Sequence, residues 1–129
     1  MSVRAHDAEQ CCYLTTTGRV TGRPHEKEIW FAFPPNPASA TLYLMAGGRE
    51  RSDWVKNLLQ NPRVAVRFAE STLTGTARII APQTDEDALT RRLLCAKYQG
   101  WRDGEPLSEW GQTALPVAVT LGQEVNGSR

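Results

Sequence analysis

The alternation of apolar and polar residues predicts a chain built mainly of short β-strands. The expected strands are residues 12–17, 26–33, 41–46, 63–68, 73–80 and 115–121. The second ends at a Pro-Pro pair, which a central strand cannot continue through. The fourth, RVAVRF, alternates strictly and therefore has one apolar face.

Two segments have the signals of helices. Residues 52–60 begin with a serine N-cap and an aspartate at the positive end of the helix dipole, and they end before an Asn-Pro pair. Residues 84–100 begin with a capping box whose acid is Asp87, and they end at a glycine. Residues 101–114 have no such signals and are expected to be irregular.

This order of elements favours a mainly β, β-rich α+β domain in which about six strands form a small closed or nearly closed barrel with two to three helices. A doubly wound sheet is disfavoured because the helices do not alternate with the strands. A chain of 129 residues fits one domain, which we place at residues 11–122. Residues 1–10 and 123–129 are expected to be flexible tails.

Composition narrows the function classes. The formal net charge of +1 disfavours nucleic-acid binding, and no apolar run reaches the roughly 20 residues of a membrane span. The N-terminus lacks the apolar core of a signal peptide. The three cysteines, two of them adjacent at positions 11 and 12, are interpreted as reduced thiols of a cytoplasmic protein. We find no metal-binding motif.

The stretch Gly18-Arg19-Val20-Thr21-Gly22-Arg23-Pro24 is the first candidate site. Glycines in a tight turn let backbone N–H groups approach a ligand oxygen. Arg19 and Arg23 are suited to bind phosphate or carboxylate oxygens, and Thr17 and Thr21 add hydroxyl donors. A plain hairpin turn with solvated arginines is the alternative.

The second candidate site is the stretch between the third strand and the first helix. Gly47, Gly48, Arg49 and Arg51 lead into the helix that starts at Ser52, a common place for a bound phosphate. An aspartate in the first turn competes for the same dipole, so an ordinary capped loop is the alternative. Together, the two stretches suggest a ligand with an anionic tail.

Aromatic and titratable residues add two further candidates. Trp30, Trp54, Trp101 and Trp110 are either core residues or the wall of a pocket for a planar ligand. His25 is either a ligand or proton donor or an ordinary residue at the end of a turn.

Three quoted segments, LTTTGRVTGRPHEKEIWF, LYLMAGGRERSDWVKNLLQNPRVAVRF and TGTARII, resemble the deazaflavin-dependent nitroreductase family. That family belongs to the flavin and deazaflavin oxidoreductases with the split β-barrel fold of pyridoxamine-phosphate oxidase-like proteins. The resemblance covers residues 13–80 and 115–119 and is loose over 84–114. The glycine-turn pattern is fairly specific only when it is joined to the downstream W-x-x-N-L-x-x-N-P segment.

The resemblance implies a split barrel that binds the deazaflavin coenzyme F-420, with FMN as the alternative. The expected cofactor-binding residues, from the resemblance and from the two glycine stretches, are Thr17, Arg19, Thr21, Gly22, Arg23, Pro24, His25, Gly47, Gly48, Arg49, Ser52, Trp54 and Asn57. The expected substrate-side residues are Trp30, Tyr98 and Trp110, and no catalytic residue is certain.

The implied activity is transfer of a hydride from F-420 to a small organic acceptor such as an enone, a quinone or a nitro compound. His25 and Tyr98 are candidate proton donors. Val20 and Ala46 stand where the family often has lysines, and Arg49 and Arg51 are the nearest replacements. An FMN-dependent enzyme, or a non-catalytic carrier of a flavin, deazaflavin or tetrapyrrole, therefore stays open. Both a homodimer and a monomer are compatible with the chain.

Overall fold

The computed structural model describes residues 6–36 and 38–125 and contains six strands and three α-helices. The strands are β1 (Cys12–Thr17), β2 (Pro24–Ile29), β3 (Thr41–Ala46), β4 (Arg63–Phe68), β5 (Ser71–Ile79) and β6 (Leu115–Glu124). The helices are α1 (Asp53–Gln60), α2 (Asp85–Gln99) and α3 (Glu109–Thr113), and a short 3-10 turn over Arg49–Arg51 precedes α1.

The strands form one antiparallel sheet that curls until its two ends meet. The order is β2-β1-β4-β5-β6-β3, so β2 and β3 are the end strands. The chain after β2 crosses to β3, where Ala32 and Tyr43 exchange backbone hydrogen bonds of 3.0 and 2.8 Å. This mainly β, curled architecture confirms the predicted fold class.

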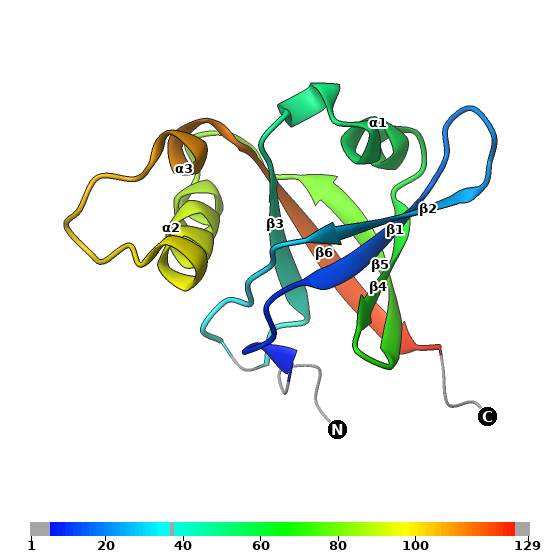
Figure 1. The fold of residues 1–129 in the computed structure, drawn as a ribbon, viewed down its shortest axis with the longest axis horizontal. Coiled ribbons are helices and arrows are strands. Elements are labelled where there is room, and N and C mark those ends of the chain that lie inside the picture. Colours follow the sequence, from blue (N-terminus) through cyan, green and yellow to red (C-terminus); the bar gives the residue numbers. More distant parts are fainter. Residues whose placement is uncertain (1–5, 37, 126–129) are drawn as a thin grey trace.

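Two apolar clusters lie on the two sides of the sheet. Large buried side chains such as Leu14, Phe31 and Phe68 fill the interior, and α1 closes one end of it with Val55. Figure 1 shows α1 over this end, whereas α2 and α3 lie outside the barrel beside β3. A second cluster, which includes Leu94 of α2, packs there against the outer side of β3 and β6.

Four parts of the chain differ from the sequence-based expectation. The strand expected at 73–80 is β5, which begins at Ser71 and ends at Ile79. The strand expected at 26–33 starts two residues earlier and ends at Ile29, because the chain then turns across the sheet toward β3. Part of the supposedly irregular segment 101–114 forms α3, whose N-cap Ser108 accepts a hydrogen bond from the Gly111 amide. The last strand continues to Glu124.

The remaining expectations concern the ends and the surface of the chain. Of the expected tails at 1–10 and 123–129, residues 1–5 and 126–129 lie outside the described residues. The His6 ring stacks on Phe68 at 5.1 Å, and β6 includes residues 123 and 124. All three cysteines are free thiols. Within residues 6–36 and 38–125 we find no helix long and apolar enough to cross a membrane and no group of side chains arranged to hold a metal ion.

Candidate functional site

A pocket of about 570 Å³, here called pocket A, lies between the β1–β2 hairpin and the start of α1. Its lining is mainly polar on the hairpin side, whereas the helix side combines polar residues with a tryptophan. The lining residues are Thr16, Gly18, Arg19, Val20, Thr21, His25, Glu26, Lys27, Ser52, Asp53, Trp54 and Asn57. A pocket of this size is in the usual range for small-molecule sites.

Arg19 fastens the glycine turn to α1. Its backbone amide and its Nη1 atom both donate to Oδ1 of Asn57, at 3.1 and 2.8 Å. Its Nη2 atom lies 3.2 Å from the carboxylate of Asp53. Asn57 is buried and also donates to the Thr16 hydroxyl, so one amide side chain ties the helix to both strand and turn. The charge of Arg19 is therefore partly neutralised by its own neighbours.

Glycine is required at two positions of this turn. Gly22 has a φ of +74°, a backbone conformation that residues other than glycine adopt only with strain. At Gly18, a Cβ atom would lie 2.6 Å from Nε2 of His25, so only glycine lets the imidazole fold over the turn. The turn is closed by hydrogen bonds from Gly18 N to Arg23 O and from Gly22 N to Gly18 O. The glycines thus shape the wall that holds His25.

Lys27 is a pocket residue that the sequence analysis missed. It pairs with Leu14 in the β1–β2 ladder, so it projects from the same face of β2 as His25 and the buried Ile29. Its ammonium group supplies a cation from within β2, although Val20 leaves the turn itself without a lysine. The sequence held one signal for this orientation: Lys27 lies two residues before the apolar Ile29, and residues two apart in a strand share a face.

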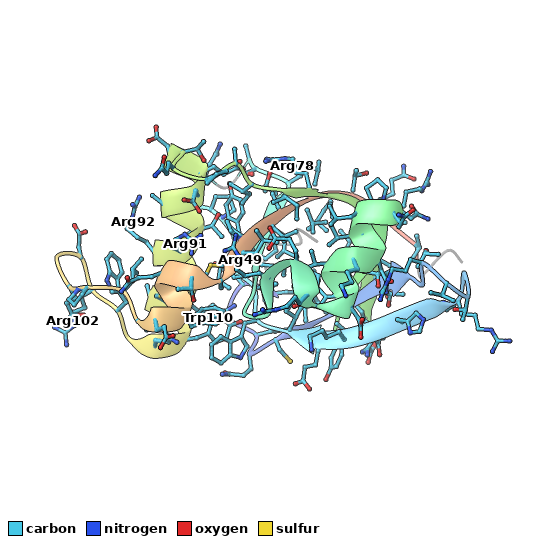
Figure 2. All side chains as sticks on the ribbon, turned by 90° about the horizontal axis from the view of Figure 1, so that it is seen from above. Arg49, Arg78, Arg91, Arg92, Arg102 and Trp110 are labelled. Carbon is cyan, nitrogen blue, oxygen red and sulfur yellow. The ribbon has the colours of Figure 1, made fainter. Side chains whose placement is uncertain are left out.

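The loop between β3 and α1 connects pocket A to α3. Ser52 lines the pocket and caps α1 without a side-chain capping hydrogen bond. Arg49, at φ of +54°, donates to the Thr113 carbonyl at 2.6 Å, and Figure 2 shows it reaching from this loop toward α3 and Trp110. A Cβ atom on Gly47 would lie 3.3 Å from the Trp110 ring. The predicted glycine loop is therefore packed against a predicted substrate-side residue.

The three predicted substrate-side aromatics form one cluster. Trp30 stacks on Tyr98 with ring centroids 4.3 Å apart, and Trp110 meets Trp30 edge-on at 5.5 Å. Trp30 is 39% exposed, which leaves part of its ring surface free. The cluster comes from the end of β2, from α2 and from α3, so distant parts of the chain build it.

A second pocket, of about 500 Å³ and here called pocket B, opens beside this cluster. It is lined by Gln10, Cys11, Glu28, Ile29, Trp30, Met45, Gln99 and Trp110. Strand β2 and its continuation contribute residues 25–27 to pocket A and residues 28–30 to pocket B. Three residues of extended chain span roughly 10 Å. The two pockets are therefore neighbours along one strand.

The Tyr98 hydroxyl is occupied by the backbone of Phe31. It donates to the Phe31 carbonyl and accepts from the Phe31 amide, each at 3.1 Å. Burial raises the pKa of Tyr98 to about 12. The hydroxyl therefore has a structural role, since it fixes the segment that follows β2.

The predicted site residues divide into three groups. Those that line pocket A are Arg19, Thr21, His25, Ser52, Trp54 and Asn57, and those that line pocket B are Trp30 and Trp110. Those in neither lining are Thr17, Gly22, Arg23, Pro24, Gly47, Gly48, Arg49 and Tyr98. The last group includes Gly22 of the turn and the two loop glycines, which line neither pocket.

Comparison with known proteins places this geometry in a family. Residues 3–122 match the model of the family described as F420H(2)-dependent quinone reductase. The chain is also similar to a solved F420 reductase, at 16% identity and a TM-score of 0.62 over 95% of this chain and 94% of that one. These matches confirm the resemblance to split-barrel oxidoreductases.

Two other solved structures share the fold. A protein from Bacteroides thetaiotaomicron, named for a proposed role in 5-nitroimidazole antibiotic resistance, has 16% identity and a TM-score of 0.73 over 95% of this chain and 79% of that one. HutZ, the heme storage protein from Vibrio cholerae, has 15% identity and a TM-score of 0.67 over 94% of this chain and 88% of that one. At these identities the solved structures establish the fold alone. Because the family model spans nearly the whole chain, the protein belongs to the F420H(2)-dependent quinone reductase family and is an oxidoreductase.

Proposed function

We propose that this oxidoreductase uses coenzyme F-420 to reduce a small organic acceptor such as a quinone, an enone or a nitro compound. The observation that carries the proposal is the pairing of pocket A, which offers cations and hydroxyl groups, with the aromatic cluster roughly 10 Å away along β2. A cofactor with an anionic tail would occupy the first environment, and a flat acceptor would stack in the second, beside the reactive ring. A family match over residues 3–122 supports the same cofactor.

The residues of pocket A fit the anionic part of such a cofactor. Lys27 and Arg19 supply positive charge, and Thr21 and Ser52 supply hydroxyl donors. Ser52 also stands at the N-terminus of α1, where the helix dipole favours an anion. Gly18 leaves room for the His25 imidazole over the turn, and His25 lines the same pocket.

When bound, the reduced deazaflavin supplies the hydride. The protein has to orient the acceptor, exclude water and provide a proton. Trp30 and Trp110 offer ring surfaces against which a flat acceptor stacks. Of the two candidate proton donors we retain His25, because the Tyr98 hydroxyl already makes two hydrogen bonds with the backbone. A His25→Asn variant that keeps both cofactor affinity and full turnover would refute this role.

FMN is the second candidate cofactor. Arg19 is paired with Asp53, and Glu26 lies among the pocket residues, so the lining charges largely balance. Among the described residues that line pocket A, Lys27 is the one lysine or arginine without an ion pair. One such cation suits a single phosphate group, which FMN also carries.

A fluorescence titration with F-420 beside FMN, each in both redox states, distinguishes the candidates. We expect saturable binding of F-420 with one site per chain. Saturable binding of FMN with no response to F-420 would replace the first candidate with the second. The absence of a response to either coenzyme would overturn the proposal.

A further inference from the structure

Pocket B carries an uncompensated negative charge. Among the described residues, its lining contains one carboxylate, that of Glu28, and no lysine, arginine or histidine. The lining is otherwise apolar or neutral, with Trp30 and Trp110 as its aromatic walls. This composition contrasts with pocket A, whose lining includes Arg19 and Lys27 as well as its two carboxylates.

The neighbouring carboxylate on the same face of β2 has a different environment. Glu26 lies 3.3 Å from the Arg67 guanidinium, which also covers the ring of Tyr13. Glu28, two residues further on, accepts a hydrogen bond from the Cys11 thiol at 3.0 Å. A neutral thiol satisfies one oxygen without cancelling the charge.

Two neighbouring groups respond to this charge. The hydrogen bond to Glu28 is the largest cause of the raised pKa of Cys11, so the thiol stays protonated. The Coulombic field of Glu28 is likewise the largest cause of the raised pKa of Tyr13. Both directions are those expected beside a negative charge, and at Tyr13 the raising effect of Glu28 exceeds the lowering effect of Arg67.

Four described cations near this pocket lie outside its lining. Lys97 is half-buried, with its buried Nζ atom 3.6 Å from the centre of the Phe31 ring, and it does not line pocket B. Arg91 pairs with Asp87 on α2. Figure 2 shows Arg92 and Arg102 among the outward side chains around α2 and α3, and neither belongs to the lining.

We infer that pocket B is the acceptor site and that Glu28 makes it select flat aromatic acceptors without negative charge. The inference rests on the proposed function, since it assigns the acceptor side of the same enzyme. Two unit charges about 6 Å apart at an effective dielectric constant of about 40 interact strongly enough to change a binding constant about tenfold. An anionic acceptor of the same shape should therefore bind about tenfold more weakly than its neutral counterpart.

The test uses two probes of matched shape, 1,4-naphthoquinone and its 2-sulfonate. Their dissociation constants are measured on cofactor-free protein from the quenching of tryptophan fluorescence, because Trp30 and Trp110 line the pocket. Glu28 is exposed, so Glu28→Gln keeps the fold, and its amide oxygen still accepts from the thiol. Glu124→Gln removes one charge at the exposed end of β6 and is the matched control.

The wild type and Glu124→Gln should discriminate against the sulfonate about tenfold, and Glu28→Gln should reduce this ratio to about twofold or less. Equal affinities in the wild type, an unchanged ratio in Glu28→Gln, or no quenching by either probe would overturn the inference. F-420 is not used in this measurement. Charge discrimination in a protein that fails to bind F-420 would refute the proposed cofactor and leave the assignment of pocket B intact.

Discussion

Replacing Lys27 with methionine tests whether β2 supplies the cation for the cofactor. The substitution keeps a long apolar stem and removes the ammonium group from pocket A, which Lys27 lines from the inner face of the strand. A hydrogen bond to a charged group contributes about 1.5–3 kcal/mol. Because Lys27 is exposed, we take the lower end of this range. The dissociation constant of F-420 should therefore be about tenfold larger in Lys27→Met than in the wild type.

The assay is the fluorescence titration of F-420 at two salt concentrations. Lys56→Met, on the exposed side of α1 and outside the pocket, controls for the change in net charge. Screening at high ionic strength should narrow the difference between the wild type and Lys27→Met. A loss below twofold, or an equal loss in Lys56→Met, would refute the reasoning.

A second substitution tests the same idea in the opposite direction. Val20 lines pocket A and is 87% exposed, at the turn position where the resembling family often has a lysine. Val20→Lys in the Lys27→Met background returns one cation to the pocket. We expect it to recover most of the lost affinity, and a double variant no better than Lys27→Met would show that the location of the charge matters more than its presence.

Three further predictions concern the supports of the site. Asn57→Ala should lower the free energy of unfolding, measured by urea denaturation, by about 2–3 kcal/mol, because the buried Asn57 side chain makes three hydrogen bonds. An unchanged free energy of unfolding would contradict these contacts. Tyr98→Phe should lower the free energy of unfolding by about 1–2 kcal/mol in the same assay, since the amide and the carbonyl of Phe31 both lose the Tyr98 hydroxyl as their hydrogen-bond partner. An unchanged value would show that water replaces this hydroxyl. Hydrogen bonds from Arg78 lower the pKa of Glu86 in the folded state. The ionised Glu86 carboxylate therefore stabilises the fold at pH values above its pKa in the unfolded chain, and this stabilisation is lost as the pH falls through its pKa in the folded state. The stability difference between the wild type and Glu86→Gln should therefore shrink on acidification below about pH 4.5, and a constant difference would argue against the pair.

Periodicity in the sequence was enough to predict the strands and the first two helices. Strict alternation in RVAVRF and the capping box at Thr84 are local signals, and the structure places β4 and α2 where those signals predicted them. α3 was missed because its five residues, Glu109–Thr113, include a glycine and carry no apolar period. Its formation depends on packing against α2, which a local pattern does not contain.

The candidate site was predictable only where local sequence patterns indicated it. Arg19 and Trp30 stood out through composition, but their partners come from elsewhere in the chain. The hydrogen bonds of Arg19 to Asn57 span 38 residues, and Tyr98, which stacks on Trp30, comes from α2. Lys27 was overlooked because it is a charged residue between two glutamates, and only the register of β2 with β1 shows that it faces pocket A.

The central claim is that the protein turns over with reduced F-420. The most direct measurement follows oxidation of reduced F-420 by 1,4-naphthoquinone in the presence of catalytic amounts of protein, against a protein-free control. We expect many moles of quinone to be reduced per mole of protein, with a rate that saturates in both reactants. Oxidation no faster than the protein-free control, or a single stoichiometric turnover, would contradict this function and leave an FMN-dependent enzyme or a cofactor carrier as the alternatives.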